Sequence, residues 1–586
     1  ITVSGIYGEN TVFMHSSDEI KTTVSSQTTK TLRKSVKTED TINNYYVSNN
    51  GLDTNIGTES APFKTIAKAI SIVNATKTPA NIYLLNGTYT GENNTNLTVD
   101  GNLKINFIGL NATIDGQANY TIKETLDPGE YYWGSSRVWW PYYNGTGNWA
   151  MNITKGSGLI TLTNLTIKNC WNPGASNINL YNTSTVDNYG NLEVDNVSFI
   201  NNCGGVGAGI RNNNGSTLVV NNSLFDGNRK SSTTGNYGAG IYNNGTATVI
   251  NSTFQNNYAR WGTVTSDKHL TIINSTFKNN IGYDGGSTYK FGSGIAINTG
   301  SADFFDAYNI TSIYTTIDGC TFINNDQLDV YADKGHLNLT NCLFNKSTCV
   351  YVPSASENLT ITYNITNNTF ISPIGSSLYN SLSSKDNITF ALRLYGSYNY
   401  TIENNKVTNL TGTSSKTIEL YANHAVIKNN TVDRKITING EYNTIINNNI
   451  TTTLDSFAID ISSQYGNNKI TNNYLSTNGL KGNAAVNYTQ LSNNISNNKP
   501  ETLLITIDDS TYSKYFDADG NLLPAYSTVG QIQITGTLSN KKFNFNKTVS
   551  LIQIDKKVTL YNITITTTEN GHIDINGIII VNTNNN

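Results

Sequence analysis

Charged residues and long apolar runs are scarce in this sequence. Asp, Glu, Lys and Arg together make up 13% of the 586 residues, and the formal net charge is -3. Binding to nucleic acid through its phosphates needs a strongly basic surface, so this charge balance argues against a nucleic-acid partner. No stretch of about 18 apolar residues occurs, so the sequence predicts no membrane span in this fragment. The chain starts at Ile1 without a signal-peptide pattern, which is typical of a mature product or a cut fragment.

Cysteine is also rare. The five cysteines contain no Cys-x-x-Cys pair, which argues against a disulfide framework and against a zinc site. The segment Asp517–Asn521 resembles the start of a calcium loop, but the glutamate that closes such a loop is absent, and a plain turn is the simpler interpretation. We therefore expect no metal and no cofactor.

Asparagine is abundant instead. About thirty asparagines lie in Asn-x-Ser/Thr sequons, the acceptor pattern for surface glycans. An Asn-rich chain also produces this pattern by chance, so both interpretations stay open.

One six-residue word, apolar-x-Asn-x-x-apolar, recurs twelve times, mostly at intervals of 18 to 32 residues. Its third position is Asn in eleven copies and Gly in one. The words end at Ile167, Phe199, Phe225, Phe254, Phe277, Phe322, Phe344, Phe370, Val407, Val432, Ile450 and Leu475.

Twenty-odd residues cannot bury a core alone, but stacked copies of such a unit can. Apolar residues on both sides of a polar interruption favour a short strand, a bend and another strand. Stacking these turns about 4.8 Å apart produces parallel sheets with ladders of identical side chains. The sequence therefore predicts an all-β fold, a single-stranded parallel β-helix, with Phe in its interior. The third-position asparagines should point inward at a common corner, and the sequons among them at Asn251, Asn274 and Asn367 should stay unmodified. The set expected to point inward is Asn251, Asn274, Asn341, Asn367, Asn429 and Asn447.

Two pairs of residues occupy matched places in different turns. Cys320 and Cys342 share one position of the word, where stacked small residues or a disulfide between turns would both fit. His269 and His336 each precede a predicted strand, and we interpret them as turn residues rather than as a base or a ligand.

The two ends of the chain differ from the repeats. Residues 1–44 form a Ser/Thr-rich segment with the composition of a linker, and residues 45–90 form an N-terminal cap whose short amphipathic helix carries Ile66, Ile70 and Val73. The β-helix follows over residues 91–499. Residues 500–586 form a C-terminal β module that looks like the start of a second β-helix, so we expect the natural protein to continue.

Several stretches resemble known proteins. The stretch Tyr45–Ile70 resembles the opening of pectin-lyase-like right-handed β-helix proteins. Gly-Ala-Gly-Ile words at Gly207 and Gly238 alternate with Phe-x-x-Asn words, as in chlamydial polymorphic outer-membrane proteins. The Asn/Thr-rich texture, the cap and the connector YSKYFDADGNL are most similar to adhesin-like surface proteins of methanogenic archaea. Over residues 45–586, the resemblance implies an extracellular protein of the cell surface or cell wall that mediates attachment, and it leaves the ligand open.

The sequence contains no complete catalytic constellation. The Asn-Thr-Asp, Asp-Asp, Gly-His-Gly and Arg-Ile-Lys words of pectin hydrolases with this fold do not recur on successive turns, and the single Asp-Asp pair is Asp508–Asp509. The outward positions that the pattern identifies are Asn, Ser and Thr, whereas glycoside hydrolysis needs two facing carboxylates. Glu124, Asp127 and Glu130 are a weak candidate, and a solvated loop explains them as well.

Aromatic residues gather in one segment, the aromatic loop 124–150, where the repeat is interrupted. All six tryptophans lie between residues 133 and 261. Aromatic rings beside polar groups suit sugar rings, although the loop could also fold onto the coil as a second small core. We predict ligand binding by Trp133, Arg137, Trp139, Trp140, Tyr142, Tyr143, Trp149, Trp171 and Trp261.

Together these patterns favour an adhesin-like, non-enzymatic protein that binds glycans, cell-surface polymers or partner cells. A polysaccharide lyase or hydrolase and a purely structural envelope spacer are the alternatives.

Overall fold

The computed structural model describes the greater part of the chain from Ile42 onward. The described residues are 42–125, 132–133, 136–137, 140–171, 184–230, 238–258, 262–281, 295–299, 310–325, 328–332, 335–347, 350–353, 357–373, 390–410, 415–478, 480–500, 503–526, 529–545, 549–552, 558–567 and 573–576. Most of the expected N-terminal segment, residues 1–41, therefore lies outside the description. No helix in the described ranges is long and apolar enough to cross a membrane.

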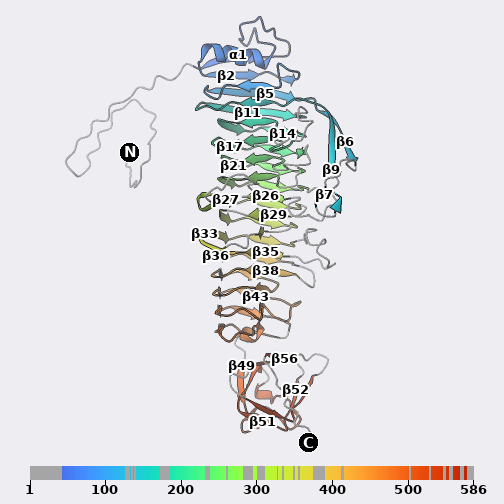
Figure 1. Cartoon of the computed structure of the whole chain (residues 1–586), viewed down its shortest axis with the longest axis vertical. Helices are drawn as coiled ribbons and strands as arrows, with labels where there is room; N and C mark the ends of the chain where they lie inside the picture. The colour runs from blue at the N-terminus through green and yellow to red at the C-terminus, as the bar shows by residue number, and fades with distance from the viewer. Residues whose placement is uncertain are drawn as a thin grey trace, which may run out of the picture. The chain divides into compact units, whose positions relative to one another are not determined.

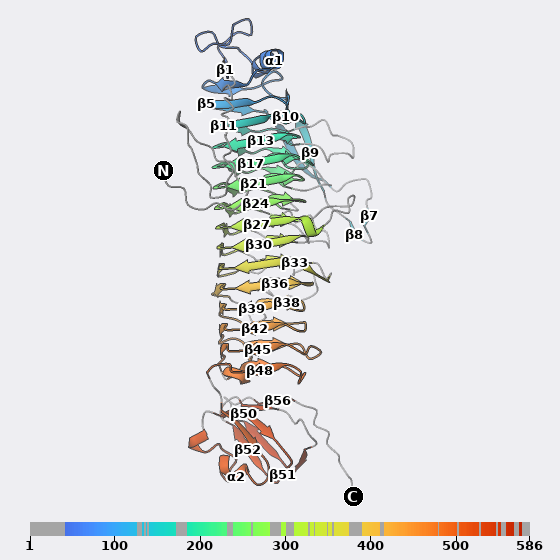
Figure 2. The same ribbon diagram turned by 90° about the vertical axis from the view of Figure 1, so that its left-hand side faces the viewer.

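Two parallel sheets run along the stack of turns (Figures 1 and 2). One sheet has 28 strands and the other has 14. A typical turn contributes two strands to the larger sheet and one to the smaller: β17 (Thr217–Asn221), β18 (Leu224–Asp226) and β20 (Ile241–Asn243). Each of these pairs in parallel with its counterpart in the next turn. The predicted parallel β-helix is thereby confirmed.

The strands of the 14-stranded sheet are short. They are β4 (Leu97–Val99), β10 (Met151–Ile153), β12 (Val186–Asn188), β16 (Ile210–Asn212), β20, β23 (Val264–Ser266), β26 (Ile295–Thr299), β29 (Leu328–Ala332), β32 (Val350–Val352), β35 (Phe390–Tyr395), β38 (Lys416–Tyr421), β41 (Ile436–Ile438), β44 (Ile459–Ile461) and β47 (Val486–Asn487).

The 28-stranded sheet carries the repeated words. Besides β17 and β18 its strands are β1 (Asn43–Val47), β2 (Ala80–Leu84), β3 (Gly87–Tyr89), β5 (Ile105–Asp115), β11 (Leu159–Lys168), β13 (Asn191–Asp195), β14 (Ser198–Ile200), β21 (Thr246–Ile250), β22 (Thr253–Gln255), β24 (Leu270–Ile273), β25 (Thr276–Lys278), β27 (Tyr314–Asp318), β28 (Thr321–Ile323), β30 (His336–Thr340), β31 (Leu343–Asn345), β33 (Glu357–Thr366), β34 (Thr369–Ile371), β36 (Ser397–Glu403), β37 (Lys406–Thr408), β39 (Val426–Lys428), β40 (Thr431–Val432), β42 (Thr444–Ile446), β43 (Asn449–Thr451), β45 (Lys469–Thr471), β46 (Tyr474–Ser476) and β48 (Asn494–Ser496).

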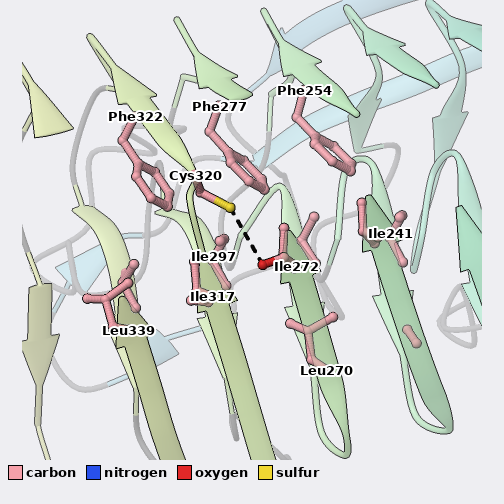
Figure 3. Close-up of a cluster of buried hydrophobic side chains, with 14 of the residues drawn as sticks. Ile241, Phe254, Leu270, Ile272, Phe277, Ile297, Ile317, Cys320, Phe322 and Leu339 are labelled. Atoms are coloured by element: carbon pink, nitrogen blue, oxygen red, sulfur yellow. Dashed lines mark hydrogen bonds between the residues drawn. The ribbon is translucent and has the colours of Figure 1, made fainter. Parts of the chain in front are cut away.

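Phenylalanine fills the interior of the early and middle turns, as predicted. Ring centroids of consecutive turns are 4.5 to 5.3 Å apart, and the rings are nearly parallel. Figure 3 shows three of these rings beside the branched side chains of the facing strands. Each ring is at most 2% exposed, so the stack lies entirely in the core. The stack consists of Phe199, Phe225, Phe254, Phe277, Phe322, Phe344 and Phe370.

The third-position asparagines do not point inward, and that prediction was wrong. They adopt left-handed backbone conformations with φ between 49° and 61°, and their side chains are exposed. Asn tolerates this conformation better than most residues, and the single glycine of the series, Gly319, has φ 62°. The left-handed residue turns the chain, and the following residue then points inward. We call this series the outer corner row: Asn111, Asn164, Asn196, Asn222, Asn251, Asn274, Gly319, Asn341, Asn367, Asn404, Asn429, Asn447, Asn472 and Asn497.

The inward ladder is formed one residue later. In the last turns, each buried Asn donates from Nδ2 to the Oδ1 of its successor over 2.9 to 3.0 Å. The same Oδ1 accepts the backbone N–H of the preceding Asn, so buried main-chain donors are satisfied. This ladder consists of Asn368, Asn405, Asn430, Asn448, Asn473 and Asn498.

A second buried ladder lies at the next bend, after the Phe strands. Its amide groups follow the same pattern over 2.9 to 3.1 Å. It ends on the fully buried Asp329, which also accepts the Ser347 hydroxyl. Its members are Asn202, Asn228, Asn257, Asn280 and Asn325.

Cysteine and serine take the inward position in the middle turns. Cys320 and Cys342 are both free thiols, so the structure has stacked small residues there and no disulfide. The Cys320 Sγ lies 3.6 Å from the Ile272 carbonyl of the preceding turn (Figure 3). Hydrogen bonding to Cys320 together with burial raises the pKa of the Cys342 thiol, which keeps that thiol protonated.

A helix covers the first turn. Helix α1 (Ile66–Thr76) buries Ile66, Ala69, Ile70 and Val73, and its N-cap Thr65 accepts a hydrogen bond from the backbone N–H of Lys68. The predicted apolar face is thus present.

Residues 503–576 have a core of their own. Strands β49 (Leu503–Ile507), β50 (Val529–Ile534), β53 (Val549–Ile552) and β56 (Ile573–Asn576) pair in parallel. Strands β51 (Thr537–Ser539) and β54 (Thr559–Tyr561) form a second parallel pair, and β52 (Lys542–Phe545) and β55 (Thr564–Thr567) form a third. Short helix α2 (Tyr512–Tyr515) packs its Tyr512 in this core. Three sets of parallel strands in chain order are the arrangement of stacked turns.

Candidate functional site

The 14-stranded sheet aligns one outward residue from every strand. In each strand the residue before the middle one is apolar and enters the core. In the strands from β4 to β44 the residue after it is buried as well, either apolar or, in β12, β16, β20, β23 and β26, an Asn, Ser or Thr. The middle residue therefore faces away from the interior. The registers place these middle residues beside one another in a single file. We call this file the outer column. It reads Thr98, Asn152, Asp187, Arg211, Tyr242, Thr265, Asn298, Tyr331, Tyr351, Arg393, Glu419, Thr437, Asp460 and Asn487.

A charged pair lies near the start of the outer column. The Arg211 guanidinium donates from Nε to one Asp187 oxygen at 2.6 Å and from Nη2 to the other at 2.5 Å. It also donates to the Tyr189 hydroxyl at 3.1 Å, and Asn213 donates to Asp187 at 2.8 Å. The Arg211 side chain is 6% exposed, so this fork holds its position rigidly.

A second charged cluster surrounds Glu419 further along. The carboxylate accepts hydrogen bonds from the Lys416 ammonium at 2.6 Å and the Tyr421 hydroxyl at 3.0 Å. The Arg393 Nε lies 2.9 Å from its other oxygen. Burial, followed by the nearby Glu419 charge, raises the pKa of the Tyr421 phenol, so Tyr421 stays a neutral donor.

The charges continue one further step. Asp460 lies two strands beyond Glu419, with Thr437 between them. It accepts a hydrogen bond from Asn487 at 2.9 Å, and Lys435 lies 3.4 Å away. Its side chain is 29% exposed, in contrast to 3% for Glu419, so Asp460 is the accessible acid of this cluster.

Tyrosine rings border the charges. Tyr395 and Tyr421 stack at 4.3 Å with nearly parallel planes, and Tyr351 approaches Tyr395 edge to face at 6.0 Å. Tyr331 and Tyr351 are tilted neighbours at 5.8 Å. The Arg393 guanidinium lies 5.6 and 5.8 Å from the rings of Tyr395 and Tyr421, within cation–π distance. All four tyrosines are half-buried, so each keeps part of its surface accessible.

This arrangement suits binding better than acid–base catalysis. Glycoside hydrolysis needs two carboxyl groups that face one bond, roughly 5 to 10 Å apart. Two strand spacings of about 4.8 Å put the backbone positions of Glu419 and Asp460 roughly in that range. However, Glu419 already accepts hydrogen bonds from Lys416 and Tyr421, pairs with the Arg393 charge and has almost no exposed surface, so it cannot reach a substrate without breaking these contacts. Within the described ranges, no group of three or more His, Cys, Asp or Glu residues is placed to hold a metal ion.

The predicted aromatic loop is partly a β-hairpin. Strands β6 (Asn119–Thr125) and β9 (Trp140–Thr146) pair antiparallel, with Thr125 opposite Trp140, and β7 (Tyr132–Trp133) pairs with β8 (Ser136–Arg137). The hairpin leaves the β-helix after β5, and the chain re-enters the β-helix before β10 (Figures 1 and 2). The backbone of most of the predicted site residues therefore lies in these strands: Trp133, Arg137, Trp140, Tyr142 and Tyr143. Trp139, Trp261, Asp127 and Glu130 lie outside the described residues.

Two tryptophans have described side chains. Trp149 is half-buried, and its backbone exchanges hydrogen bonds with Asn96, which fixes the base of the hairpin. Trp171 is 6% exposed and packs against Cys203 and Ala118, so this ring is a packing residue of the coil rather than an accessible face.

The histidines and the calcium-like segment have structural partners. His269 lies just before β24, whereas His336 is the first residue of β30, so the interpretation of His336 as a turn residue was wrong. The Tyr314 ring stacks on both histidine rings, and the His336 ring nitrogens contact the Thr362 hydroxyl and the Thr311 carbonyl. Asp517 accepts the backbone N–H groups of Asp519 and Asn521, which is a turn.

Sequence reasoning missed the outer column. Its strands are short and share no common word, and the repeated words all belong to the other sheet. The available signal was an apolar-x-apolar triplet with a variable middle residue, such as Ile418–Glu419–Leu420 or Ile459–Asp460–Ile461, and it is present in only part of the turns.

No protein-family model matches the chain, and no curated protein matches it. Among solved structures, the complex of XylC with xylose matches with 9% identity and a TM-score of 0.30, covering 89% of this chain and 86% of that one. PfbA, a surface adhesin of Streptococcus pneumoniae, matches with 14% identity and a TM-score of 0.29, covering 73% and 88%. The alginate lyase AlyGC of family PL6 matches with 10% identity and a TM-score of 0.24, covering 86% and 89%. Likenesses this weak decide nothing about activity, so the β-helix assignment rests on the strand pairing of the chain itself.

Proposed function

We propose that this protein is an adhesin-like, glycan-binding protein of the cell surface or cell wall. The observation that carries the proposal is the cluster of half-buried tyrosines around Arg393 and Glu419 on the outer column. Aromatic faces stack on the C–H faces of sugar rings, and fixed polar groups beside them bond hydroxyls. The net charge of -3 makes a polysaccharide a better partner than a nucleic acid.

The aromatic hairpin is proposed as a second contact region. Its rings, together with Arg137, would meet the same polymer or a partner cell. The residues proposed here are Trp133, Arg137, Trp139, Trp140, Tyr142, Tyr143, Trp149 and Trp261. A single sugar stacked on a ring contributes on the order of 1 kcal/mol beyond hydrogen bonds, by analogy with aromatic pairs. Attachment would then depend on many copies per cell.

A glycan array with the purified chain tests the proposal. Tyr395→Ala should abolish binding to whichever glycans the unaltered chain retains, without moving the thermal unfolding midpoint by more than a few degrees. The matched control is Tyr83→Ala, because Tyr46 and Tyr83 stack in the same way at 4.9 Å on the first turns, away from the charged cluster. Equal binding by both variants and the unaltered chain would contradict the assignment of this cluster. Trp149→Ala tests the hairpin in the same assay.

A polysaccharide lyase or hydrolase is the second candidate function. It is favoured by one observation, the presence of two outward carboxylates, Glu419 and Asp460, two strands apart. Incubation with uronate-containing and neutral polysaccharides should release neither unsaturated nor reducing ends if the binding proposal holds. Release that stops in Asp460→Asn would establish the enzyme instead. A chain that binds no glycan and cleaves none would be a structural envelope spacer.

A further inference from the structure

We infer that the outer corner row is a modification site that carries N-linked glycans, with Asn367 and Asn429 as its principal acceptors. The inference depends on the proposed surface location, because glycans are attached to proteins that enter that route. It reverses the expectation that these sequons stay unmodified, since that expectation rested on inward-pointing side chains.

Sequons and burial exclude each other among the described residues. Eighteen asparagines are buried there, and none of them is the acceptor of an Asn-x-Ser/Thr sequon. In the ladder beside the outer corner row, from Asn368 to Asn473, the reason is geometric. The residue two places after each of these asparagines is again inward and belongs to the core, as Phe370 follows Asn368 and Val432 follows Asn430. A core position cannot hold Ser or Thr without burying a hydroxyl.

The opposite holds on the outer corner row. The residue two places after a left-handed Asn lies on the outer face of the next strand, so a hydroxyl is tolerated there. Thr369 follows Asn367, and Thr431 follows Asn429, and neither threonine is buried. The acceptor amide and the hydroxyl that a glycosylating enzyme must recognise are therefore both accessible from solvent. The sequons of the row are at Asn111, Asn164, Asn196, Asn251, Asn274, Asn367 and Asn429.

Spacing along the row selects among these acceptors. Consecutive turns are about 4.8 Å apart, which is too close for two branched glycans to extend side by side. Asn111, Asn164 and Asn196 lie on adjacent turns, and so do Asn251 and Asn274. Within each of these groups, a glycan on one asparagine therefore hinders modification of its neighbour. Asn367 and Asn429 lie two turns apart with Asn404, which has no sequon, between them. On their other sides the row continues with Asn341 and Asn447, which have no sequons either.

Existing contacts leave room for the modification. The Asn429 Nδ2 donates one hydrogen bond to Glu403 at 3.3 Å. An Asn amide has two N–H donors, and attachment of a sugar replaces only one of them. The buried ladder at Asn430 is unaffected because its amide groups lie on the other side of the chain.

Intact-glycopeptide mass spectrometry on the full protein, isolated from the cells that produce it naturally, tests the inference. With the glycan localised to a single residue by fragmentation, Asn367 and Asn429 should be modified on most molecules. Asn341, Asn404 and Asn447 should be unmodified, since they share the corner and lack the hydroxyl. Localisation is needed because other sequons, such as Asn338, Asn399 and Asn449, lie within a few residues of these controls. Unmodified Asn367 and Asn429 would overturn the inference.

Variants expressed in the same cells separate the corner geometry from the sequon. Thr369→Val and Thr431→Val should each remove the glycan at one acceptor and leave the other occupied. Lys406→Thr creates a sequon at Asn404, and its glycan should lower the occupancy at Asn367 and Asn429. Full glycan occupancy at Asn367, Asn404 and Asn429 would refute the claim that glycans on adjacent turns exclude each other. Absence of a glycan at Asn404 would refute the claim that the corner conformation makes an asparagine an acceptor. Glycan-array binding by unglycosylated protein from a bacterial host tests the proposed function separately, so either proposal can fail alone.

Discussion

At the scale of single residues, an asparagine here takes one of two roles, and a shift of one position along the chain decides which. Asn429 is exposed with φ 57°, whereas Asn430 is buried and joins the neighbouring turns through its amide. The amide of Asn430 also donates to the Ile402 carbonyl at 2.9 Å. The first residue supplies a backbone conformation, and the second supplies hydrogen bonds.

These roles predict opposite responses to substitution. Asn429→Gly should be nearly neutral, because Gly319 occupies the equivalent corner with the same conformation. Asn430→Ala should lower the free energy of unfolding by about 1–3 kcal/mol for each buried group that loses its partner. Urea unfolding followed by circular dichroism measures both. Equal destabilisation by the two substitutions would contradict the assignment.

Arg434 and Asp455 form a buried ion pair, in which each charge is stabilised by the other. The guanidinium donates to the two carboxylate oxygens at 2.7 and 3.1 Å, and both side chains are at most 4% exposed. Thr452 and the Lys435 backbone N–H donate to the same carboxylate. Asp455→Ala should destabilise the coil by about 3–5 kcal/mol, because it leaves a buried charge without its partner. Asp100→Ala, at the exposed pair with Lys77, is the control and should cost about 1 kcal/mol or less.

The same pair predicts a dependence on acid. Burial alone would raise the pKa of Asp455, but the hydrogen bonds from Arg434 and Thr452 outweigh it and hold the pKa below its usual range. A lowered folded-state pKa adds stability above the unfolded value near 3.9, and this contribution is lost as the pH falls through the folded value. Thermal midpoints recorded from pH 6 down to pH 2 should therefore fall less steeply in Asp455→Asn than in the unaltered chain. If the midpoints of both proteins fall equally with pH, another carboxylate causes the loss of stability in acid.

At the scale of elements, the repeated words predicted the 28-stranded sheet and its Phe stack but misplaced the bend. The pattern of apolar residues identifies which positions face the core, and Phe254 and Phe277 were correctly placed on that basis. It does not identify the left-handed residue, because Asn fits both that conformation and an inward amide. The doubled word Asn-Asn at Asn447–Asn448 holds one of each.

The outer column shows a different limit. A triplet such as Ile459–Asp460–Ile461 is too short for its period to be recognised, and its partners are separated by loops of varying length. The neighbours of Glu419 come from β35 and β38, and the register between these strands depends on the turns stacked before them. Only the folded chain brings these charges and tyrosines together.

The Phe stack predicts how one element depends on the next. Phe322→Ala removes a ring packed between Phe277 and Phe344 and should cost about 3–5 kcal/mol. Phe322→Leu keeps most of the volume and should cost about half as much or less. Tyr314→Ala on the adjoining strand is the control, since that ring is 53% exposed. Chemical unfolding measures the free energy of unfolding of the three variants, and a large decrease in Tyr314→Ala would contradict the expected order.

At the scale of the whole molecule, the described chain contains two separate large cores. One extends from Val47 to Val486, and the other from Ile505 to Phe545. Cores without shared residues unfold independently unless an interface couples them. Calorimetry should therefore resolve two transitions. Phe543→Ala should lower the midpoint of one, and Phe277→Ala that of the other. A single transition shifted by both substitutions would show that the two parts unfold as one unit.

Because the bend at the outer corner row is the same in successive turns, the length of such a β-helix can change during evolution by whole turns. The two halves of a word meet at the same left-handed residue in turn after turn, whereas the connections to the 14-stranded sheet vary in length. Duplication or loss of one turn would therefore alter the length of the coil by a constant step of about 4.8 Å, whatever the number of residues in that turn. Insertions in the variable connections would leave that step unchanged. Length and surface chemistry can thus be selected independently, one by gain or loss of turns and the other by change within them.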